Sequence, residues 1–181
     1  MNFKNQEVKY LALSGICLAI SVIMPNIFHL AGPQGGKMFL PLFWGVAIAA
    51  LIVPMKYAVL VGLLAPVASH LISAMPPVPM LYFMLVELTV YAVSVRLISR
   101  KLNPFLSIFF GLVISRTCYI LVAAAAGRLF QLPPMFSSIT ALCAGVLVSL
   151  PGIIMQVVLV PAIYHIYRKV SHAELVADCN H

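Results

Sequence analysis

Long apolar runs, separated by short polar or proline-containing stretches, make up almost the whole chain. A helix needs about 20 apolar residues to cross the ~30 Å hydrocarbon core of a bilayer. The runs do not alternate between apolar and polar residues, as the strands of a membrane β-barrel do. The pattern therefore predicts an all-α integral membrane protein, a compact bundle of six transmembrane helices. The predicted spans are 8–28, 38–54, 57–74, 79–98, 104–127 and 139–167.

Local features refine three of these spans. The second and third are short, and the turn at 54–56 between them allows only a tight hairpin. The sixth is long and contains Pro151 and Pro161, so we expect it to be tilted or kinked. We expect residues 1–170 to form a single six-helix membrane domain and residues 171–181 to form a short cytoplasmic tail.

Composition supports a membrane protein. Hydrophobic residues make up 63% of the chain and charged residues only 8%, whereas a soluble domain has about 45–50% apolar and about 25% charged residues. The net charge is +7, but most of the basic residues lie between apolar runs, where they encode membrane orientation. These features exclude an ordinary soluble enzyme, a disordered chain and a nucleic-acid-binding domain.

The positions of the basic residues predict the orientation, because cytoplasmic loops carry an excess of Lys and Arg. With the N-terminus inside, the outer loops hold only Lys37 and Arg128. An even number of spans then places both termini in the cytoplasm. No small-x-small cleavage site follows the first run, so we expect it to be a retained span and not a signal peptide. The basic residues on the cytoplasmic side are Lys4, Lys9, Lys56, Arg96, Arg100, Lys101, Arg168 and Lys169.

Two charged residues lie inside the predicted spans, where an ionisable group is costly and therefore points to function. At 1.5 Å per residue, Glu87 lies about 12 Å from the outer end of the fourth span and Arg116 about 17 Å from the outer end of the fifth. The two residues thus reach similar depths on consecutive antiparallel helices, which makes an ion pair plausible. Such a pair is either a structural bridge or a site where one or both groups meet a polar ligand, and the sequence leaves both open.

The neighbours of this pair suggest a cavity. Met84 and Tyr91 share the Glu87 face of the fourth helix, and this stripe suits a cavity for a partly aromatic molecule. Methionine at helical spacing is, however, also common in plain packing. Gln156 falls in the inner half of the sixth span, where we expect a hydrogen bond between helices. Polar, Gly-rich and Pro-rich residues gather at the outer side, which favours a pocket open to the outside.

Catalytic and metal-binding motifs are absent from the sequence. It contains no G-x-S-x-G, no H-E-x-x-H and no nucleotide-binding G-x-x-x-x-G-K-[ST]. The cysteines have neither C-x-x-C spacing nor the paired histidines of a zinc site. We therefore expect a protein that is not an enzyme, with no catalytic residue, no cofactor and no bound metal.

Several segments resemble a known family beyond their hydropathy. They are Gly35-Gly36-Lys37-Met38-Phe39-Leu40-Pro41, the stretch 57–66, the Met75-Pro76-Pro77 turn, Glu87 and Ser115-Arg116. With six short-looped spans, both termini inside and no nucleotide site, the chain up to about Val170 resembles the substrate-binding S components of energy-coupling factor (ECF) transporters. That family takes up vitamins and related micronutrients in bacteria and archaea.

The resemblance implies a binding subunit in a bacterial or archaeal cell membrane. It implies capture of a vitamin-like small molecule from outside and its delivery through a membrane-embedded T component and two ATPases, which hydrolyse ATP. Glu87 and Arg116 are then expected near the floor of the pocket. Tyr82, His70, Arg128 and the Gly-rich first loop are expected nearer its mouth.

The resemblance also implies a surface for the T component. In that family the first helix carries small residues in an A-x-x-x-A pattern, and Gly15 and Ala19 are the nearest match here, with Ala12 beside them. The first residue of the pattern is Gly instead of Ala, but small residues at this spacing still let two helix backbones approach closely. Small residues also commonly pack within a bundle, so both uses stay open.

Two other functions are compatible with the sequence. One is a secondary transporter or channel that works without ATPases, although the chain shows no inverted repeat and no series of acidic residues for proton coupling. The other is a membrane scaffold in which the Glu87–Arg116 pair is purely structural. Pantothenate, a pyridine vitamin, a flavin and a cobalamin precursor are all compatible as substrates, and a shared or a dedicated coupling module is equally compatible.

Overall fold

The computed structural model describes residues 3–30, 39–133, 136 and 138–179, which contain seven helices and no strand. Five of these helices are long and apolar enough to cross a membrane, namely α1, α4, α5, α6 and α9. The predicted all-helical class is confirmed for the described residues, and the five helices indicate a multi-pass membrane protein. The helices are α1 (Phe3–Leu30), α3 (Leu42–Ile52), α4 (Met55–Ser73), α5 (Met80–Ile98), α6 (Pro104–Leu129), α8 (Ile139–Val148) and α9 (Leu150–Cys179).

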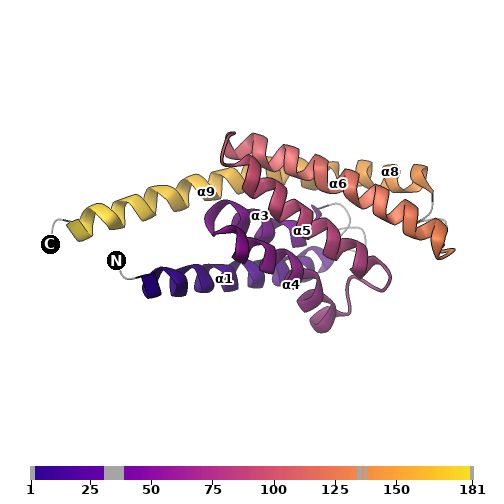
Figure 1. Ribbon diagram of the computed structural model, residues 1–181, viewed down its shortest axis with the longest axis horizontal. Coiled ribbons are helices and arrows are strands. Elements are labelled where there is room, and N and C mark those ends of the chain that lie inside the picture. The colour runs from indigo at the N-terminus through magenta and orange to yellow at the C-terminus, as the bar shows by residue number, and fades with distance from the viewer. Residues whose placement is uncertain (1–2, 31–38, 134–135, 137, 180–181) are drawn as a thin grey trace.

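The short helix α3 lies at the centre of the bundle (Figure 1). It packs against α1, α4, α5 and α9, and every residue from Leu42 to Leu51 is buried. These residues are apolar on all sides of the helix, which is the pattern of a fully buried helix. With 11 residues α3 is about 16 Å long, so the second predicted span forms a helix over only part of its length.

The long helices surround α3 in chain order. α1 packs beside α4, α4 beside α5 and α5 beside α6, and α9 closes the bundle against α3 and α6. α1 and α4 begin at the same end, where Lys56 Nζ lies 2.5 Å from Glu7 Oε1 and the Tyr57 hydroxyl donates to Glu7 Oε2 over 3.0 Å. The first turns of α1 and the last turns of α9 point to the same side of the bundle (Figure 1).

The sixth predicted span is divided between two helices. α8 ends at Val148 and α9 begins at Leu150. Pro151 explains the break, because proline has no N–H to donate and its ring crowds the preceding turn. The Ser149 hydroxyl donates to the Val146 carbonyl over 2.8 Å at this point. Pro161, in contrast, lies within α9 without ending it, and α9 continues to Cys179, past the expected end of the span at residue 167.

Glycines set the closest approaches between helices. A Cβ atom added to Gly45 on α3 would lie 2.0 Å from the main-chain oxygen of Cys17 and 2.2 Å from Ser21 Oγ, both on α1. A Cβ added to Gly62 on α4 would lie 2.9 Å from the main-chain oxygen of Leu88 on α5. Glycine at these positions lets the helix backbones come together, as in other membrane bundles.

We expect Gly45→Ala to lower the free energy of unfolding by about 1–3 kcal/mol, the usual cost of overpacking. The added methyl group would meet the main chain of α1, so α1 and α3 would have to separate. Gly15→Ala on α1 is the matched control, because nothing lies within 4 Å of a Cβ there. Thermal unfolding in detergent measures both variants. An unchanged midpoint for Gly45→Ala would contradict the close α1–α3 contact.

Candidate functional site

The ion pair predicted between Glu87 and Arg116 is present and buried. Arg116 Nη1 lies 2.9 Å from Glu87 Oε1, and the Glu87 side chain is 1% exposed while that of Arg116 is 15% exposed. The pair joins α5 to α6, which pack along each other. Removing two charges from water is unfavourable unless further hydrogen bonds satisfy their remaining polar atoms. The surroundings of the pair therefore decide what it can do.

Several polar atoms around the pair have no hydrogen-bond partner in the described part of the chain. Glu87 Oε1 and Arg116 Nη1 meet as charges without the alignment of a hydrogen bond, and Arg116 Nε has no partner. The Tyr91 hydroxyl, one turn after Glu87 on α5, is buried and has none either. Buried polar groups in proteins are normally hydrogen-bonded. A carboxylate, a guanidinium and a phenol with unused capacity thus form a site able to bind another polar group.

An aromatic pair supports this site from α3 and α5. The Arg116 guanidinium carbon lies 5.1 Å from the centroid of the Phe43 ring, and the Phe43 and Tyr91 ring centroids are 5.2 Å apart. The face of an aromatic ring attracts a cation, so Phe43 orients Arg116 without using its N–H groups. The sequence analysis did not predict a role for Phe43. It lies in a uniformly apolar helix, and such a pattern does not show which side of the helix faces the site.

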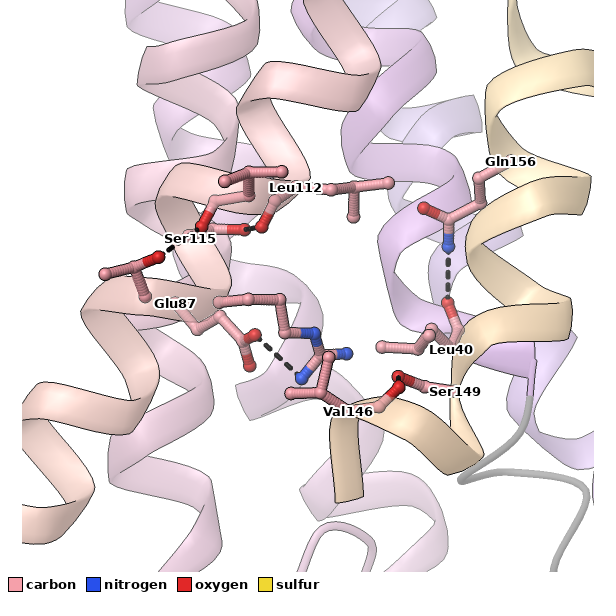
Figure 2. A network of polar contacts seen from close by, with 10 residues as sticks. Leu40, Glu87, Leu112, Ser115, Val146, Ser149 and Gln156 are labelled. Carbon is pink, nitrogen blue, oxygen red and sulfur yellow. Dashed lines mark hydrogen bonds and ion pairs between the residues drawn. The ribbon is translucent and has the colours of Figure 1, made fainter. Parts of the chain in front are cut away.

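A third buried polar group approaches from α9. Gln156 is fully buried, its Nε2 donates to the main-chain oxygen of Leu40 over 3.1 Å, and its Oε1 lacks a partner among the described residues. Figure 2 shows Glu87 and its ion pair on one side of this region, and Leu40, Ser149 and Gln156 on the other. The hydrogen bond expected of Gln156 thus forms, but with the main chain just before α3 and not with another helix.

The two other candidates on α5 differ in their surroundings. Met84, three residues before Glu87, is half-buried and packs against the main hydrophobic core. Tyr82 is 60% exposed. It lies five residues before Glu87, which at about 100° per residue puts it on the opposite side of α5. Met84 therefore lies near the pair, whereas Tyr82 faces away from it.

The candidates nearer the predicted outer end are separate from the pair. His70 Nδ1 lies 2.8 Å from the Pro76 main-chain oxygen and so links the end of α4 to the following loop. Arg128 is exposed in the last turn of α6. Across the described residues, no hydrogen bond or ion pair joins His70 or Arg128 to Glu87 or Arg116. The Gly-rich loop expected to close the pocket lies mostly outside the described residues, which omit 31–38.

The small residues predicted as a partner surface lie on the outside of α1. Ala12, Gly15 and Ala19 are all exposed, and their spacing places them on one side of the helix. Cys17 and Ser21, on another side, are buried against α3. Within the described residues the bundle packs through that second side, and the Ala12–Gly15–Ala19 face remains uncovered.

Comparisons with known proteins give no identification: no protein family, curated protein or solved structure matches the chain. Among the described residues, no group of three or more His, Cys, Asp or Glu side chains is placed to hold a metal ion. A functional proposal therefore rests on the residues of the chain itself.

Proposed function

We propose that the chain is the substrate-binding S component of an ECF-type importer in a bacterial or archaeal cell membrane. It captures a vitamin or related micronutrient from outside and delivers it through a T component and two ATPases. One observation carries the proposal: the buried Glu87–Arg116 pair lies close to the Tyr91 hydroxyl, which has no partner among the described residues, and Phe43 of α3 contacts both Arg116 and Tyr91. Intramembrane charges of this kind mark substrate sites in transport proteins.

The chemistry of the site indicates the class of ligand. The guanidinium of Arg116 is planar and matches a carboxylate with two parallel hydrogen bonds. Glu87 accepts hydrogen bonds from an ammonium or hydroxyl group, and the Tyr91 hydroxyl both donates and accepts. Phe43 adds an aromatic face beside Arg116. These groups suit a small polar or zwitterionic molecule that carries an acid group and a ring.

The proposal includes a topology of six membrane spans with both termini in the cytoplasm. Because Glu7 contacts Lys56, α1 and α4 begin at one end of the bundle, so the chain between Leu30 and Met55 has to return across it. α3 lies within that segment. The positive-inside rule assigns this end, which carries Lys56 and the basic residues after α5, to the cytoplasm.

The short length of α3 favours a cavity on the outer side. On this topology Leu40 and Pro41, the non-helical residues directly before α3, lie below the outer surface of the membrane. Non-helical backbone is tolerated at membrane depth only where protein buries it or where it lines a cavity. Gln156 satisfies the Leu40 carbonyl there, close to the region that holds Glu87 (Figure 2).

Purification from the native host in a mild detergent tests the proposed assembly. We expect one integral membrane T component and ATPase subunits to co-purify with the tagged chain and to be identified by mass spectrometry. ATP-independent flux through the purified chain alone, in liposomes, would contradict the proposal and favour a secondary transporter or channel.

A further inference from the structure

A second polar region lies at the end of the bundle where α5 ends and α6 begins. A partly open cavity of about 350 Å³ lies there between these two ends and α9. Its lining includes Arg96, Arg100, His165 and Arg168, and no acidic side chain among those that the structure describes. The volume falls in the range of about 300–1,000 Å³ that is usual for small-ligand sites. The lining therefore favours an anion.

Arg96 is the least exposed of the four basic residues named in the cavity lining. Its Nε is buried and has no partner in the described chain, and its Nη1 donates one long hydrogen bond, 3.4 Å, to the main-chain oxygen of Leu51. A guanidinium has several N–H donors and no acceptor. One carbonyl at the end of α3 does not neutralise its charge, so Arg96 keeps donors for an anionic group.

The first turn of α6 lies beside the cavity, although Pro104 itself has no N–H to donate. Asn103 and Pro104, which begin this helix, both line the cavity. No side chain caps the helix at Asn103. The first N–H groups of a helix have no partner within it, and together with the helix dipole they attract anions. The positive end of the α6 dipole thus adds to the positive charge of the arginines beside the cavity.

Exposed apolar side chains adjoin the cavity. Leu102, which lines it, and Phe105 and Leu106 in the next turn are each exposed. In a membrane-spanning chain these side chains meet lipid acyl chains, directly beside the basic residues. Basic pockets between transmembrane helices are known to hold anionic lipid headgroups.

We propose that this cavity binds the phosphate headgroup of an anionic phospholipid. Three lining arginines, with no acidic side chain beside them in the described lining, attract the phosphate, and they repel the ammonium group that makes phosphatidylcholine neutral. Inorganic phosphate shares the headgroup chemistry but has no acyl chains for Leu102 and Phe105 to contact. The proposal is independent of the transport function, since none of these residues belongs to the Glu87–Arg116 site.

Native mass spectrometry of the full chain in detergent, titrated with phosphatidylglycerol or phosphatidylcholine of equal chain length, tests this site. We expect phosphatidylglycerol to bind at least about tenfold more tightly. Arg100→Gln/Arg168→Gln, which changes two exposed residues and so spares the fold, should weaken phosphatidylglycerol binding by about tenfold or more. Lys9→Gln/Arg128→Gln is the matched control: it removes the same charge from exposed positions outside the cavity and should leave the affinity unchanged.

Three results would overturn the proposal. Equal affinity for the two lipids would show that charge does not select the ligand. Equal loss of affinity in the double variant and its control would show that the net charge of the protein attracts the lipid, and that this cavity does not bind it. Displacement of bound phosphatidylglycerol by millimolar inorganic phosphate would assign the cavity to a soluble anion.

Discussion

Arg116→Met should lower the free energy of unfolding by about 3–5 kcal/mol, because it leaves the buried Glu87 carboxylate without its partner charge. Methionine keeps an unbranched side chain that fills irregular space, so the lost charge dominates over lost packing. Denaturant or thermal unfolding in detergent measures the effect. Lys56→Met is a useful comparison: the Lys56–Glu7 pair is 59% exposed on both sides, and breaking an exposed pair changes stability by only about 0–1 kcal/mol.

Adding Glu87→Gln to Arg116→Met separates the structural role of the pair from a binding role. The double variant should recover most of the lost stability, because replacing both partners leaves no unpaired charge buried. Its affinity for the ligand that co-purifies with the wild-type chain should stay at least about tenfold weaker, corresponding to about 1.4 kcal/mol. Recovery of both stability and affinity would instead make the pair a structural bridge only.

Gly15→Trp and Ala19→Trp should each abolish assembly with the proposed T component while changing the stability of the isolated chain by no more than about 0.5 kcal/mol. Both positions are exposed, and nothing lies within 4 Å of a Cβ at Gly15, so the fold accepts the larger side chain. A tryptophan on this face would hold a partner helix away from the α1 backbone. Co-purification of the T component and thermal unfolding of the isolated chain are the two readouts.

Leu64→Trp is the matched control for the α1 face. Leu64 is 47% exposed and lies on α4, so the same bulky side chain is added to a different outer surface. Assembly should survive this change. Loss of assembly in Leu64→Trp but not in the α1 variants would move the partner surface from α1 to α4.

The long helices were predictable because apolar length alone identifies a membrane-crossing helix. The predicted span 79–98 matches α5 at Met80–Ile98 to within one residue. The ends of α3 and the break at Ser149 were not predictable in the same way. A continuous apolar run gives no signal where a helix stops, and of two prolines in the last span only Pro151 lies at a break.

The central pair was predictable because Glu87 and Arg116 are isolated charges at matching depths on neighbouring antiparallel helices. Phe43 and the Gln156–Leu40 hydrogen bond depend on how α3 and α9 pack, which no local pattern encodes. The position of Tyr82 follows from helical geometry, since five residues is about one and two-fifths turns. Its exposure on the far side of α5 from Glu87 therefore agrees with helical geometry, whereas the family resemblance implied a position at the mouth of the pocket.

The central claim is that this chain binds a small polar molecule at Glu87 and Arg116. Native mass spectrometry of the protein, extracted gently from its own host, tests it most directly. We predict a bound species of vitamin-like mass in the wild-type chain, and its loss in the Glu87→Gln/Arg116→Met variant at equal folded stability. A wild-type chain that carries no small molecule, alone or with its partners, would contradict the claim and leave a scaffold or channel as the better description.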